Sequence, residues 1–150
     1  SVVSNSPPLL AMSLSVDING RPRDTLVNLQ DEGIGAQVTI FVLNADNDSA
    51  RIVDVTAAQL PHSKSEWDEI KHNPPTFSPA LAAIHCELAE INSLPLGASG
   101  KIVILRVKDV EMPDSIDSQS IPQKLFQIGF DRLGPGPNPS DWQYKLGRYD

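Results

Sequence analysis

The residues best suited to chemistry lie close together near the N-terminus. Arg21, Arg23 and Thr25 alternate along one short segment, at the point where a helix is expected to begin. Arginine supplies a planar fork of donors, threonine supplies a hydroxyl, and the start of a helix adds free amide groups and the positive end of a dipole. Together these groups would bind a phosphate. The alternative is a solvated turn in which Asp24 caps the helix.

A second set of residues could line a pocket for a flat molecule. His62, Glu66 and Trp67 flank a loop, and Trp142 and Tyr144 lie near the C-terminus. An indole ring stacks on flat ligands, and a histidine exchanges protons near neutral pH. The alternatives are a surface loop anchored by its tryptophan and a C-terminal dimer contact. We take His62, Trp67, Trp142 and Tyr144 as candidate substrate-binding residues.

Other polar residues have simpler interpretations. Ser13 and Ser15 alternate with apolar residues, so both would face the same side of a strand, toward a ligand or toward solvent. His85 and Cys86 lie in an apolar strand, where we expect a structural histidine and an inert buried thiol. The three histidines and the single cysteine lack metal-ligand spacing, so no metal is expected. We assign no catalytic acid, base or nucleophile.

Composition limits the classes of protein to consider. The 150 residues, 40% of them hydrophobic, suit one domain with a real core. A net charge of −7, from 12 basic and 19 acidic residues, argues against an extended nucleic-acid groove and against an anionic membrane surface. One cysteine cannot form an internal disulfide, and no apolar stretch is long enough to span a bilayer. We therefore expect a cytoplasmic protein with a small-molecule substrate.

The pattern of the chain predicts a single, mainly β domain. The predicted strands cover residues 9–16, 36–43, 80–91, 101–110 and 125–133, and a last short element covers 142–149. Short helices are predicted after Asp24 as far as Gly33, over 50–59 and over 65–71. Residues 80–91 have the composition of a helix but also alternate, and we choose a strand. Residues 101–110 are apolar on both faces and should form a central strand, whereas no strand is identified upstream of Pro7.

Several of these segments resemble the flavin-reductase-like family. Residues 7–15 read Pro-Pro-Leu-Leu-Ala-Met-Ser-Leu-Ser, and Arg23-Asp24-Thr25 occupies the family's Lys-Asp-Thr position with Asn28 in register. The loop before Glu66-Trp67, the strand that holds Cys86, and Arg132-Leu133-Gly134 followed by Tyr144 resemble later family segments in order and spacing. The similarity extends over nearly the whole chain.

The resemblance implies a split β-barrel with short helices, usually a homodimer that binds FMN at the subunit interface. It implies an oxidoreductase in which NAD(P)H, as a transient co-substrate, passes hydride to the flavin. Arg21, Arg23, Thr25, Ser13 and Ser15 would then hold the cofactor. The alternative is a flavin-independent biosynthetic enzyme, a cyclase or isomerase that reuses the pocket, or a non-catalytic ligand-binding module.

Overall fold

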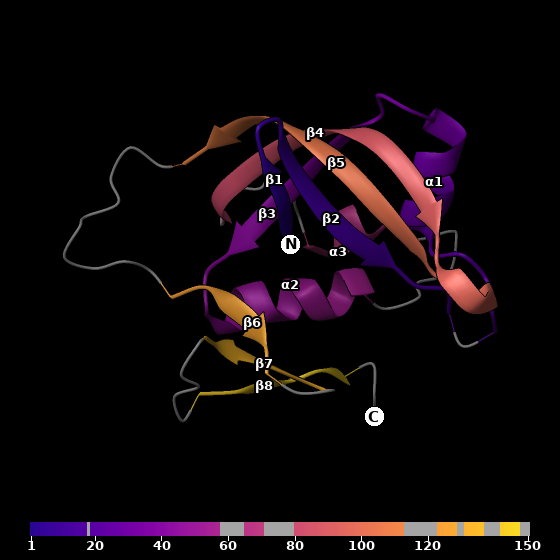
Figure 1. The fold of residues 1–150 in the computed structure, drawn as a ribbon. Helices are drawn as coiled ribbons and strands as arrows, with labels where there is room; N and C mark the ends of the chain where they lie inside the picture. Colours follow the sequence, from indigo (N-terminus) through magenta and orange to yellow (C-terminus); the bar gives the residue numbers. More distant parts are fainter. Residues whose placement is uncertain are drawn as a thin grey trace. The chain divides into compact units, whose positions relative to one another are not determined.

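The computed structural model describes residues 1–17, 19–57, 65–70, 80–112, 123–128, 131–136 and 142–147. Along the chain the elements are β1 (Val2–Asn5), β2 (Pro8–Leu14), α1 (Asp24–Glu32), β3 (Gln37–Leu43), α2 (Asn47–Ala57), α3 (Glu66–Ile70), β4 (Ala80–Ser93), the 3₁₀ turn η1 (Pro95–Gly97), β5 (Lys101–Glu111), β6 (Leu125–Gln127), β7 (Arg132–Pro135) and β8 (Tyr144–Lys145) (Figure 1). Strands therefore dominate, with short helices between them, as predicted. The chain divides into two compact units, residues 1–40 with 84–111 and residues 41–83 with 112–150.

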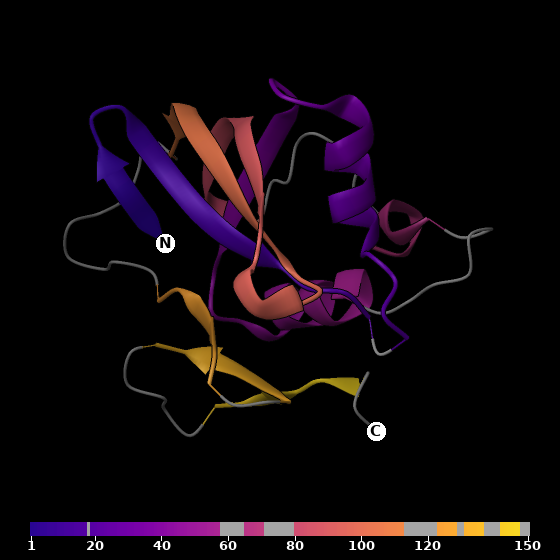
Figure 2. The ribbon, with the colours of Figure 1, turned by 45° about the vertical axis from the view of Figure 1, so that its right-hand side comes forward.

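A five-stranded sheet has the strand order β1-β2-β5-β4-β3 (Figures 1 and 2). The predicted central position of β5 is confirmed, because β5 lies third of five and pairs with β2 in antiparallel register. Val103 and Leu105 on β5 are fully buried, and they form the core of the first unit with Leu29, Cys86 and Leu88. Ile104, between them, is only partly buried, so the two faces of β5 are not equivalent.

The five-stranded sheet confirms one strand chosen from an ambiguous pattern and contains one strand that the sequence did not predict. The ambiguous segment after residue 80 is strand β4, because Cys86 and Leu88 both face the core from alternating positions. Strand β1 precedes Pro7, where no strand was identified, and pairs with β2 at the edge of the sheet. Its short length and its isolated valine pair gave too weak a pattern to recognise.

Helix α1 lies on the core through two leucines. Leu26 and Leu29, three positions apart, are its buried residues. The residue that precedes the helix is Arg23, which has extended backbone geometry and makes no side-chain cap. The predicted cap by Asp24 is therefore wrong: this carboxylate lies inside the first turn, where it interacts favourably with the helix dipole. The predicted end near Gly33 is confirmed by the Gly33 amide, which donates to the Leu29 carbonyl at 3.0 Å.

Helix α2 begins earlier than the predicted 50–59 segment, because Asp46 caps it. The carboxylate of Asp46 accepts the Ser49 amide at 2.7 Å and the Asn44 side-chain amide at 2.8 Å. Ser49, Ala50 and Ile52 form the buried face of α2. Among the helices that the structure describes, none is long and apolar enough to cross a membrane.

The second sheet corrects the predicted single strand over residues 125–133. The chain instead forms a hairpin, in which β6 pairs antiparallel with β7, and β7 pairs with β8. A Cβ atom on Gly136 would lie 2.4 Å from the ring of Phe126, so the ring packs directly on the glycine backbone. Gly134, which belongs to β7, is also closely packed, since a Cβ atom on it would lie 2.9 Å from Ile128 Cδ1.

Candidate functional site

The segment between β2 and α1 folds back on itself as a narrow antiparallel ladder. Val16 forms a bridge with Pro22, and the Asp17 amide donates to the Arg21 carbonyl at 2.8 Å. The turn between them contains Gly20 at a φ of 78°, a conformation that glycine adopts readily. The end of β2 is thereby held against the residues that lead into α1.

The register of this ladder bears on the predicted cofactor-binding residues. In an antiparallel pair, residues directly opposite each other share a side, and side chains alternate along each strand. Extending the register of the bridge by one residue pairs Ser15 with Arg23, and strand alternation then predicts that Ser13, Ser15, Arg21 and Arg23 share one side. Thr25 follows in the first turn of α1, and all five side chains are exposed.

The start of α1 adds main-chain donors beside these side chains. The first helical hydrogen bonds run from the Leu26 and Val27 amides to the Arg23 carbonyl, at 2.8 and 3.1 Å. The two earlier amide groups, of Asp24 and Thr25, have no partner within a helix of this geometry. Since Arg23 provides no side-chain cap, these amide groups suit an anion at the helix start.

Two carboxylates offset the positive charge of residues 17–25. Residues 17–25 contain Asp17 and Asp24 beside Arg21 and Arg23, so their formal charges cancel. The Asp17 carboxylate accepts the amides of Asn19 and Arg21, each at 2.8 Å, and so stabilises the turn. Recognition of a phosphate here would therefore depend on directed hydrogen bonds more than on net charge.

The C-terminal aromatic residues are anchored to α2. The Trp142 indole donates to Asn47 Oδ1 at 3.0 Å, and the Tyr144 hydroxyl donates to Asp54 Oδ2 at 3.3 Å. Both rings pack against the small core around Ala50. Burial and the neighbouring Asp54 carboxylate raise the pKa of Tyr144. These contacts give both residues a structural role in the second unit, and their contact with substrate stays a prediction.

The remaining predicted substrate residues are placed only in part. Trp67 lies on α3 of the second unit with 36% of its surface exposed, and its backbone amide donates a hydrogen bond to Ser65 Oγ at 3.3 Å. His62 lies outside the described residues. The phosphate set, in contrast, belongs entirely to the first unit.

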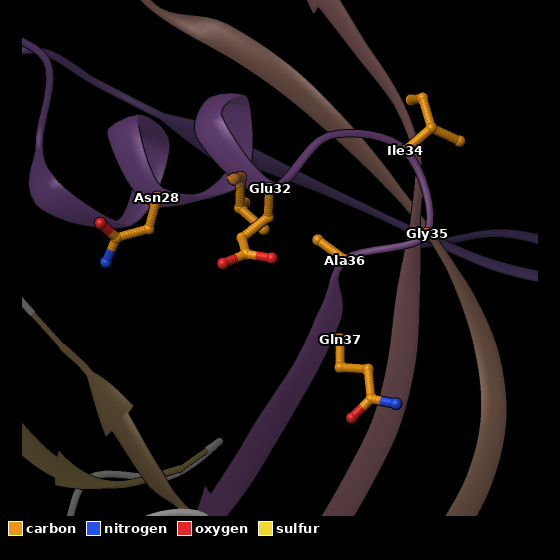
Figure 3. A pocket seen from close by; sticks show the side chains of 7 residues that line it. Asn28, Glu32, Ile34, Gly35, Ala36 and Gln37 are labelled. Carbon is orange, nitrogen blue, oxygen red and sulfur yellow. The ribbon is translucent and has the colours of Figure 1, made fainter.

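A hollow of about 600 Å³ at the other end of α1 was not predicted. It is lined by residues of α1, of the following loop and of the start of β3: Asn28, Leu29, Glu32, Ile34, Gly35, Ala36 and Gln37. Asn28 and Glu32 project from one side of α1, one turn apart, whereas Ile34 points away from them (Figure 3). The signal in the sequence was the spacing of Asn28 and Glu32 followed by two glycines, which have φ angles of 79° and 92°.

Residues 1–133 match the family described as the flavin reductase like domain. The chain belongs to this family. A comparison with curated proteins found no significant match. The resemblance inferred from the Arg23-Asp24-Thr25 segment and its neighbours is thus confirmed at the level of the family.

Solved structures of similar fold come from several bacteria. A protein from Shewanella frigidimarina described as a flavin reductase with split barrel domain aligns with a TM-score of 0.70 at 18% identity, over 96% of this chain and 74% of its own. An FMN-binding protein from Thermus thermophilus gives 0.66 at 17%, over 95% and 76%. The NADH:FAD oxidoreductase of Streptomyces globisporus gives 0.58 at 15%, over 95% and 72%. At these identities the likeness establishes the fold, which is the predicted split β-barrel.

The described part of the chain contains no candidate metal centre. No group of three or more His, Cys, Asp and Glu side chains in it is placed to hold a metal ion. Cys86 is buried, and this burial raises the pKa of its thiol, which fits the inert cysteine that was expected.

Proposed function

We propose that this protein binds FMN and catalyses the reduction of flavin by NAD(P)H. The observation that supports the proposal is the narrow ladder between the end of β2 and the residues before α1, whose register predicts that Ser13, Ser15, Arg21 and Arg23 share one side, next to Thr25 and the open start of α1. Membership of the flavin reductase like family supports the same conclusion. The flavin, when bound, supplies the redox chemistry by accepting hydride from the nicotinamide.

The residues of this chain would bind and orient the cofactor. Arg21 and Arg23 would hold the phosphate oxygens through charge-assisted hydrogen bonds, and Thr25 would add its hydroxyl beside the free amides of α1. Ser13 and Ser15, on the same side, would extend these contacts along the end of β2. None of these groups is required to donate or remove a proton.

The choice of FMN over FAD follows from the chemistry of this set of donors. FMN ends in a phosphate monoester with three terminal oxygens, whereas the phosphates of FAD are linked to an adenosine. Forked arginine donors at an exposed helix start suit a terminal phosphate with several free oxygens. Among similar structures, one is an FMN-binding protein and another an NADH:FAD oxidoreductase, so the two flavins should be compared directly.

The proposal is tested with the purified wild-type protein. Any flavin that co-purifies is identified by mass spectrometry, and oxidation of NADH and of NADPH is followed with FMN, FAD or riboflavin added. We expect binding of FMN and flavin-dependent oxidation of a nicotinamide. If no flavin binds and no nicotinamide is oxidised above the rate without protein, the redox function is wrong. The flavin-independent biosynthetic enzyme, such as a cyclase or isomerase, would then replace it.

A further inference from the structure

A hydroxyl, an imidazole and a carboxylate line up on three neighbouring strands, apart from the phosphate set. Thr39 Oγ1 on β3 lies 3.2 Å from His85 Nδ1 on β4, and His85 Nε2 lies 3.4 Å from Glu111 Oε2 on β5. The strand order places β4 between the other two strands. All three residues belong to the first unit.

The carboxylate of Glu111 favours one tautomer of His85. Its Oε2 atom lies in ion-pair contact with His85 Nε2 at 3.4 Å, and Nε2 has no aligned hydrogen-bond partner among the described residues. A carboxylate oxygen at that distance attracts an Nε2–H group and repels a bare nitrogen lone pair, so the neutral ring carries its proton on Nε2. Its Nδ1 is then a bare acceptor and receives the hydrogen bond from the Thr39 hydroxyl. The result is an alcohol bonded to a base, with a carboxylate behind the base. This is the general arrangement that activates a serine or threonine as a nucleophile.

The row is partly exposed and lies near a hollow that could hold a ligand. Thr39 is partly buried, and the His85 side chain is 34% exposed. Thr39 alternates with the core residues Val38 and Ile40, and therefore shares a face of β3 with Gln37. Gln37 lines the hollow at the end of α1 (Figure 3). Two residues of a strand span about 7 Å, so the hollow is within the length of a small molecule from the hydroxyl.

We propose that Thr39 and His85 form a second, non-redox site, which catalyses acyl transfer from small esters. Thr39 Oγ1 attacks the ester carbonyl, and its proton passes to His85 Nδ1. The bond between the carbonyl carbon and the alcohol oxygen breaks, and the alcohol leaves with the proton held by His85. Water then hydrolyses the acyl-threonine, releases the carboxylic acid and restores the hydroxyl. Glu111 is a positioning residue that holds the Nε2–H tautomer and stabilises the protonated imidazole.

The hollow indicates the class of ester. Asn28, Glu32 and Gln37 place two carboxamides and one carboxylate around it. Such groups favour a substrate portion that carries an ammonium group or several hydroxyl groups over a purely apolar one. An amino ester should therefore be bound more tightly than its unsubstituted counterpart.

The first test uses a fluorophosphonate, which reacts with activated hydroxyl groups, and 4-nitrophenyl acetate as substrate. We expect one phosphonyl group per chain, mapped to Thr39 by mass spectrometry, with loss of fluoride. Removing the base by His85→Gln should lower kcat by roughly 10²- to 10⁴-fold. Thr39→Val, which keeps the shape and removes the hydroxyl, should abolish labelling and turnover, whereas Thr39→Ser should restore both.

Glu111 and Glu32 provide the controls that separate catalysis from structure. The Glu111 side chain is 71% exposed, so Glu111→Gln should leave the melting temperature unchanged while it lowers kcat by roughly tenfold or more. Glu32→Gln should raise KM for glycine 4-nitrophenyl ester by a larger factor than KM for 4-nitrophenyl acetate, because only the amino ester carries the ammonium group. Labelling at another residue, or turnover by Thr39→Val within threefold of wild type, overturns the proposal. Flavin binding is measured on the same variants, and its outcome is independent because none of them alters the phosphate set.

Discussion

Replacing Arg23 with alanine examines the placement of the flavin phosphate most directly. A charge-assisted hydrogen bond contributes about 1.5–3 kcal/mol. Arg23 is exposed and stands beside Asp24 in a segment of zero net charge, so solvent and the carboxylates weaken its contact. We therefore expect the lower part of this range, about 1.5–2 kcal/mol, which corresponds to roughly 10- to 30-fold weaker FMN binding.

The assay is fluorescence quenching of FMN and of riboflavin by wild type and Arg23→Ala. Riboflavin lacks the phosphate, so its affinity should be nearly the same for both proteins. The melting temperature should also be unchanged, since an exposed arginine without a cap contributes little to stability. Arg106→Ala is a matched control, because it removes the same charge from an exposed position paired with Leu9, at the opposite end of β2 from Ser15.

The result that refutes this reasoning is FMN binding by Arg23→Ala that is as tight as binding by wild type. The phosphate would then lie elsewhere, although the protein could still use FMN. An equal loss for FMN and riboflavin would also contradict it, because the variant would have disturbed the site as a whole.

Three further predictions concern stability and assembly. Leu105→Ala should lower the free energy of unfolding by about 2–5 kcal/mol in urea titrations, whereas Ile104→Ala, at a partly exposed position, should lower it by clearly less. Burial raises the pKa of Asp46, but hydrogen bonds from Ser49 and Asn44 outweigh this effect and hold the pKa below its ordinary value of 3.8. The stability that this cap contributes is therefore present above pH 3.8 and is lost as the pH falls through the lower pKa of the folded state. The roughly 1 kcal/mol penalty of Asp46→Ala at neutral pH should therefore shrink in acid, and a penalty independent of pH would contradict the capping role. Light scattering at micromolar concentration should give twice the 16.3 kDa mass of one chain, and a monomer mass would rule out the expected homodimer.

The elements that the sequence predicted well are those with a strong local pattern. The run of branched residues from Lys101 onward gave the central strand β5, and the leucine spacing with a terminal glycine gave α1. Cys86, with apolar neighbours at alternate positions, was correctly placed in the core. Each of these predictions depended on residues that are close together in the sequence.

The predictions that failed were those in which tertiary packing overrides the local pattern. Residues 125–133 were predicted as one strand, although Gly129 and Asp131 are both residues of a kind that favours turns. In the hairpin, the ring of Phe126 lies on the bare backbone of Gly136, a contact that no local pattern reveals. At α1, the common preference for aspartate as a cap did not hold, since the ladder from β2 fixes Arg23 in the position before the helix.

The same contrast separates the two candidate sites. The phosphate set lies within residues 13–25, so the sequence alone groups its members, through their alternation on either side of a short turn. The row of Thr39, His85 and Glu111 is different, because Thr39 and His85 are 46 residues apart and meet only through the pairing of β3 with β4. A shift of one residue in that pairing would turn the His85 side chain to the core face and leave Thr39 without a base. For this reason the sequence indicated only a structural role for His85, because the pairing of the strands brings Thr39 and Glu111 next to it. The kinetics of Thr39→Ser and Glu111→Gln decide whether this arrangement is catalytic.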